Sequence, residues 1–135
     1  MEIPTHFVKM KVIWVDDELI EVRIEISNKW FSGIGDVYLT DSFAEFVQNL
    51  KGYPKDLSDN DLSYEYVQYN SFSINFFIKY GKVRLGVEII DDPSDGNNRI
   101  HLEMYVEPAS IDTFQKQLVS ILKNRDGEAL LIGFE

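Results

Sequence analysis

Ser110 to Asn124 read SIDTFQKQLVSILKN, and this stretch predicts a helix against which the rest of the chain packs. Its large apolar residues recur at spacings of three, four and seven, so they form one stripe along a helix. The stripe consists of Ile111, Phe114, Leu118, Ile121 and Leu122. Pro108 is expected to end the strand before the helix, and Ser110 to cap its first turn. We therefore expect an amphipathic helix that covers a sheet.

Most of the remaining chain has the period-two alternation or the β-branched and aromatic content that is typical of strands. The predicted strands cover residues 7–15, 20–26, 36–40, 64–69, 72–78, 83–89, 99–107 and 128–134. In the first of them, Val8, Met10, Val12 and Trp14 are expected on the apolar face. Lys9 and Lys11 are expected opposite the charged side chains of the second strand, on a solvent-exposed face.

A second helix is predicted to begin at Ser42, where Ser42 and Glu45 fit a capping box. Phe43, Phe46, Val47 and Leu50 form its apolar stripe. The fold class is therefore α+β, a mostly antiparallel sheet of about seven or eight strands with two amphipathic helices packed on one face. Both halves of the chain place strands before a helix with a Phe-x-x-x-Leu core, an order that leaves an internal duplication open.

The chain has 135 residues and is expected to form a single α+β domain over residues 1–135. It contains no cysteine and no apolar run near the roughly 20 residues that cross a bilayer, so we expect a cytoplasmic protein. The net charge is −10, which argues against binding nucleic acid or an anionic membrane. It favours a cationic partner, although acidic surfaces also simply keep small soluble proteins apart.

Residue types that carry catalysis are scarce. His6 and His101 are the two histidines, and neither has a cysteine or a Gly-x-Ser-x-Gly serine to pair with. The acidic residues gather in turns, where aspartate caps backbone N–H groups and stays solvated. The loop that starts at Asp91 has Pro93 where a calcium loop needs an oxygen ligand. We therefore expect no enzymatic activity, no metal and no cofactor.

Two stretches carry a resemblance to a known family. One is the hairpin followed by Val37-Tyr38-Leu39-Thr40 and a Phe-rich helix ending in Leu50-Lys51-Gly52-Tyr53-Pro54. The other is the closing run from Val106 to Phe114 with Leu118 and the final strand. In this order and spacing the chain resembles WapI-like immunity proteins of bacterial polymorphic toxin systems. The resemblance implies a cytoplasmic protein that binds and neutralises a toxin's C-terminal domain, typically a nuclease acting on RNA, and it transfers no catalytic residue.

The prediction is thus a non-enzymatic inhibitor that occludes a cognate, basic toxin domain through an acidic surface. The candidate contacts are the acidic turns: Asp56, Asp59 and Asp61; Asp91, Asp92 and Asp95; and Asp16, Asp17 and Glu18. The alternative is a module that binds a small ligand or carbohydrate through exposed tyrosine rings, with Tyr64, Tyr66 and Tyr69 as candidates. The residues do not determine the partner's identity or the oligomeric state.

Overall fold

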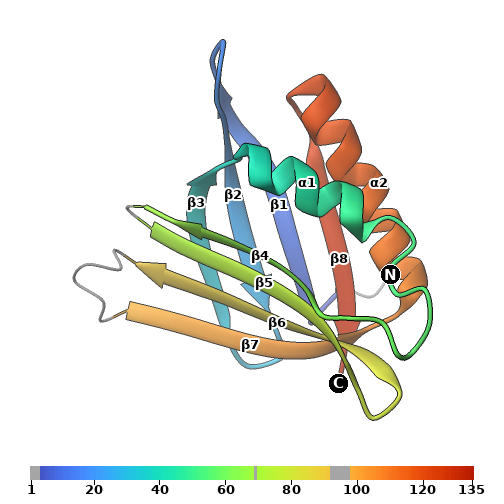
Figure 1. Cartoon of the computed structure of the whole chain (residues 1–135). Helices are drawn as coiled ribbons and strands as arrows, with labels where there is room; N and C mark the ends of the chain where they lie inside the picture. Colours follow the sequence, from blue (N-terminus) through green and yellow to red (C-terminus); the bar gives the residue numbers. More distant parts are fainter. Residues whose placement is uncertain (1–3, 69, 92–97) are drawn as a thin grey trace.

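The computed structural model describes residues 4–68, 70–91 and 98–135, which form eight strands and two helices (Figure 1). The elements in chain order are β1 (Phe7–Val15), β2 (Ile20–Ser27), β3 (Ser32–Tyr38), α1 (Asp41–Leu50), β4 (Leu62–Val67), β5 (Asn70–Lys79), β6 (Lys82–Asp91), β7 (Asn98–Val106), α2 (Pro108–Asn124) and β8 (Glu128–Phe134). The predicted α+β class, with an antiparallel sheet and both helices on one face, is confirmed.

The sheet order is β3-β2-β1-β8-β7-β6-β5-β4, and the paired strands run antiparallel. The chain therefore reads as two successive β-β-β-α-β units, and the last strand of each unit pairs with the first strand of the other. As predicted, Lys9 lies opposite Glu25 on the outer face, with 3.9 Å between Lys9 Nζ and Glu25 Oε2.

The sheet bends where β8 meets β7, at the pairs Tyr105–Phe134 and Val106–Gly133. As a result β4 to β7 cross in front of β1 to β3, and the apolar faces of the two halves meet the helices in one core (Figure 1). Both helix stripes reach that core as predicted: Phe43, Phe46, Val47 and Leu50 from α1, and Ile111, Phe114, Leu118 and Ile121 from α2. Leu122 is partly buried against the same core.

Two glutamines of α2 bind main-chain groups of neighbouring elements. Gln115, which is buried, donates from Nε2 to the carbonyl of Val47 over 3.2 Å, and so binds a carbonyl in the last turn of α1. Gln117 Oε1 accepts from the main-chain N–H of Leu130 over 2.8 Å. The first bond joins the two helices, and the second joins α2 to β8 on the side that faces away from β1.

Strand β3 begins at Ser32, earlier than the predicted start at Asp36, and it includes Gly33 and Gly35. A Cβ on Gly33 would lie 2.7 Å from Ile100 Cγ2, and one on Gly35 would lie 2.9 Å from Ile89 Cγ2. The glycines therefore let the edge of the bent sheet approach β6 and β7.

Both predicted helix caps were wrong, by two residues for α1 and by three residues for α2. Thr40, in an extended conformation, caps α1 by accepting from the N–H of Phe43, and Ser42 lies inside the first turn. Helix α2 starts at Pro108, which has no N–H to leave unpaired, so Ser110 is likewise inside the helix. Across the described ranges, neither helix is long and apolar enough to cross a membrane.

Candidate functional site

The three predicted acidic groups lie at separate corners of the molecule. In Figure 1 the turn between β1 and β2 is at the top, the loop between α1 and β4 is at the lower right, and the end of β6 is at the left. The structure therefore does not bring them into one surface. Asp92 and Asp95 lie outside the described residues, so only Asp91 represents the third group.

In the loop between α1 and β4, carboxylates bind the loop's own backbone. Asp56 accepts from both the N–H and the hydroxyl of Ser58, and these hydrogen bonds lower the pKa of Asp56. Asp59 Oδ2 accepts from the N–H of Lys55 over 2.9 Å. These two side chains therefore stabilise the loop, and Asp61 is exposed beside them.

Asp91 ends β6 at the corner where that strand meets β3. It lines a hollow of about 440 Å³ together with Arg23, Asp36 and Asn70. The guanidinium of Arg23 already pairs with Asp36, with 2.9 Å between Nε and Oδ1. This corner therefore carries both signs of charge.

The group of Asp16, Asp17 and Glu18 lies on the β1–β2 tip, a name used here for residues 13–19. Asp16 Oδ1 accepts from the N–H groups of Glu18, over 2.8 Å, and Leu19, over 2.7 Å. These two bonds hold the pKa of Asp16 below its ordinary value. Asp17 and Glu18 are exposed, and they belong to the turn at the top of the molecule.

Arg125, at the end of α2, binds the main chain of the β1–β2 tip. Its guanidinium donates to the main-chain carbonyls of Asp16, Asp17 and Leu19. The residue has a left-handed backbone conformation, with φ of 57°, and its N–H closes the helix on the carbonyl of Ile121. Sequence reasoning missed this role, because it links residues more than a hundred positions apart.

The β1–β2 tip also exposes large apolar side chains. Their exposed fractions are 37% for Ile13, 48% for Trp14, 41% for Val15 and 40% for Leu19. β1 pairs with β8 only as far as Lys11 among the described residues, and a bulge follows between Val12 and Trp14. The prediction that Trp14 faces the core was therefore wrong. The unbroken apolar run from Val12 to Val15 was the available signal, because it ends the alternation.

The predicted tyrosine site is not exposed. Tyr64 and Tyr66 are both buried, and α1 lies over β4 and covers Tyr64. The ring of Tyr64 meets Phe43 edge to face at 5.0 Å, and burial raises the pKa of both tyrosines. These rings are core residues, which corrects the expectation that they are free to stack on a ligand. Tyr69 lies outside the described residues.

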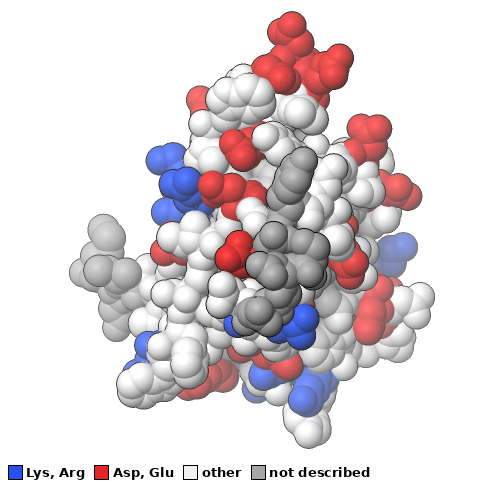
Figure 2. Space-filling view, turned by 90° about the vertical axis from the view of Figure 1, so that its left-hand side faces the viewer, with Lys and Arg blue, Asp and Glu red and all other residues white. Residues whose placement is uncertain are grey.

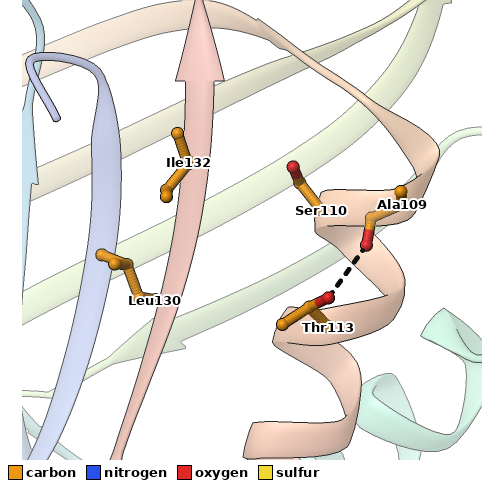
Figure 3. Close-up of a pocket in the computed structure, with 5 residues that line it drawn as sticks. All are labelled: Ala109, Ser110, Thr113, Leu130 and Ile132. Atoms are coloured by element: carbon orange, nitrogen blue, oxygen red, sulfur yellow. Dashed lines mark hydrogen bonds between the residues drawn. The ribbon is translucent and has the colours of Figure 1, made fainter. Parts of the chain in front are cut away.

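A hollow of about 240 Å³ separates the start of α2 from β8 (Figure 3). Leu130 and Ile132 line it from β8, and Ala109, Ser110 and Thr113 line it from α2. The Thr113 hydroxyl already donates to the Ala109 carbonyl over 3.2 Å. The lining contains no charged group, and the volume is below the roughly 300–1,000 Å³ of ligand pockets, so the hollow does not resemble a small-molecule site.

An ion-pair network covers the outer face of β6 and β7. His101 lies between two carboxylates, with 3.5 Å from Nδ1 to Glu88 and 3.4 Å from Nε2 to Glu103. Arg84 binds Glu103 over 2.7 Å and lowers its pKa. Nowhere in the described part of the chain do three or more His, Asp or Glu side chains gather so as to hold a metal ion.

No protein-family model, no curated protein and no solved structure matches this chain. Function is therefore inferred from the chain's own surface. The β1–β2 tip is the place where predicted acidic residues meet exposed apolar side chains.

Proposed function

We propose that the protein is a non-enzymatic inhibitor that binds a basic, nuclease-type toxin domain and occludes its nucleic-acid-binding surface. The observation that carries this proposal is the net charge of −10. Figure 2 shows Asp and Glu side chains scattered over one face, with Lys and Arg among them, and a group of acidic side chains at the top, at the height of the β1–β2 tip. A domain that cleaves RNA binds the phosphates through Lys and Arg side chains, and carboxylates of a protein inhibitor can pair with the same side chains.

The resemblance to WapI-like immunity proteins supports the same proposal from the sequence side. It implies a cytoplasmic inhibitor of a polymorphic toxin. Electrostatic attraction also fits the task, because an inhibitor must reach its toxin before the toxin reaches RNA. Complementary charge raises association rate constants to about 10⁸–10⁹ M⁻¹s⁻¹ at low salt.

The first test captures the partner. The purified chain is immobilised and exposed to lysate from the cells that encode it, and bound proteins are eluted with salt and identified by mass spectrometry. We expect a basic protein that elutes as salt rises, because the Debye length falls from about 10 Å at 0.1 M to about 3 Å at 1 M. Capture of acidic proteins alone, or salt-insensitive binding, would contradict the electrostatic part.

The second test measures neutralisation. The captured protein is produced recombinantly, and its cleavage of RNA is followed while the chain is added. We expect cleavage to stop near one equivalent, because a stoichiometric complex covers the RNA-binding surface. A partner that binds but keeps cleaving RNA at full rate would show that the chain is not its inhibitor.

A further inference from the structure

We propose that the β1–β2 tip is the element that docks into the partner. Its exposed apolar side chains insert into an apolar slot, and Asp17 and Glu18 pair with Lys or Arg side chains at the rim of that slot. This inference rests on the proposed function and names the surface that performs it. The occupant is thus a basic protein domain with an apolar slot.

Exposure of apolar side chains supports the docking role. Trp14 and three further large apolar side chains lie within the seven residues of the tip, where β1 has left its pairing with β8. Hairpins without a third strand have little to bury their apolar residues against. Tryptophan is also among the residues that most often dominate the affinity of protein interfaces.

Hydrogen bonds hold the conformation of the tip in the unbound chain. Asp16 holds the turn through the N–H groups of Glu18 and Leu19, and Arg125 holds three of its carbonyls. A preformed element loses less conformational freedom on binding than a flexible loop does. Because the Arg125 guanidinium is engaged with main-chain oxygens, it does not pair with the carboxylates of Asp17 and Glu18 in any bond found among the described residues.

Charge identifies the kind of partner. The tip carries Asp16, Asp17 and Glu18, so a second copy of this chain or an anionic membrane would be repelled. The turn between β2 and β3 carries two aromatic side chains with larger exposed fractions, 74% for Trp30 and 65% for Phe31. There, however, the Lys29 ammonium lies 5.2 Å from the centroid of the Trp30 ring, and its positive charge would repel a basic partner. The β1–β2 tip is therefore the better fit.

The test uses the chain's two tryptophans, one on each exposed turn. The chain is labelled with 5-fluorotryptophan, and the two ¹⁹F resonances are assigned with Trp14→Phe and Trp30→Phe variants. The unlabelled recombinant partner from the capture experiment is then added. We expect the Trp14 resonance to shift or broaden and the Trp30 resonance to stay in place, because only Trp14 enters the interface.

Affinities of matched variants add a second readout. Trp14→Ala is expected to weaken binding by at least about 30-fold, as an interface anchor does. The controls are Trp30→Ala and Val119→Ala, the latter being an apolar side chain on α2 that is 45% exposed; each is expected to change affinity less than about threefold. Circular dichroism and melting confirm that each variant is folded.

Charge variants test the rim. Asp17→Asn with Glu18→Gln is expected to slow association about tenfold at low salt and much less at high salt. Glu45→Gln with Glu65→Gln removes the same charge from two exposed residues, one on α1 and one on β4, and is expected to leave association within about twofold. Equal effects of both pairs would show that net charge, not the tip, attracts the partner.

The outcomes separate the two proposals. If a neutralising complex forms but only the Trp30 resonance changes, or neither changes, the tip inference is overturned and the proposed function stands. If the Trp14 resonance changes on concentrating the chain alone, the occupant is a second copy, which also overturns the inference. If no basic protein is captured, the proposed function and the docking inference fail together.

Discussion

The main-chain N–H of Leu130 donates to the side-chain oxygen of Gln117 over 2.8 Å. On its other edge, β8 pairs with β1, with Lys9 opposite Leu130. β7 reaches β8 only at Gly133 and Phe134 within the described residues, so a helix side chain supplies the acceptor that a strand would otherwise provide. The bend in the sheet is thus stabilised by α2.

Gln117→Leu is expected to lower the free energy of unfolding by about 1–3 kcal/mol, because it leaves the Leu130 N–H without its acceptor. Urea denaturation measures the change. Gln117→Glu is the matched control, since it keeps an acceptor oxygen at the same reach and should retain most of the stability. If the leucine variant is as stable as the parent, water replaces the lost acceptor and the bond does not stabilise the bend.

Gly33→Ala is expected to lower the free energy of unfolding by about 1–3 kcal/mol, because the added Cβ would overlap Ile100 and force the strands apart. Its distance to Ile100 Cγ2 would be 2.7 Å. Gly86→Ala is the control, since the nearest side-chain atom there, on His101, lies 3.7 Å away. Combining Gly33→Ala with Ile100→Ala should recover part of the loss, and strict additivity would contradict a direct clash.

Stability is expected to fall as the pH rises above about 10. Burial raises the pKa of Tyr53, Tyr64 and Tyr66, so these hydroxyls keep their protons in the folded state while the unfolded chain releases them. The folded state then binds more protons, and the free energy of unfolding decreases with pH. Urea denaturation between pH 9 and pH 11.5, values chosen to bracket the ordinary tyrosine pKa, measures the slope. A flat profile would contradict the burial of these hydroxyls.

Arg125→Gln is expected to loosen the β1–β2 tip, because the shorter amide cannot donate to all three tip carbonyls. Hydrogen exchange at the amides of Glu18 and Leu19 should accelerate about tenfold, while the melting temperature changes little. Lys123→Gln removes a charge from the same end of α2 without touching the tip, so it should leave exchange unchanged. Equal exchange in both variants would mean that Asp16 alone holds the turn.

Sequence periodicity predicted which residues form strands and helices better than it predicted which strands pair. The predicted first and last strands, residues 7–15 and 128–134, have the bounds of β1 and β8. The apolar stripe of α1 was predicted residue by residue, because burial on one face imposes a helical spacing. In α2 the predicted Leu122 is only partly buried, and the buried Gln115 was not predicted. The pairing of β1 with β8 was not predicted, since alternation identifies a strand and its buried face but not its partner.

Exposure at the candidate site was harder to predict. Tyr64 and Tyr66 were expected on the surface, and Tyr64 is buried under α1, which covers β4 from another part of the sequence. Trp14 was expected in the core, and its exposure depends on where β8 begins. Both errors have one cause, because exposure is set by distant elements that a local pattern does not contain.

The sheet order has a consequence for synthesis. β8 lies beside β1 inside the sheet, not at its edge, yet the ribosome makes it after every other described strand. Until β8 emerges, β1 and β7 each lack a neighbour on one side, and only the pairing of β4 with β5 joins the strands of the two units. Phe7 can pair with Ile132 only after β8 has been made, and the unpaired edges of β1 and β7 are prone to aggregation until then.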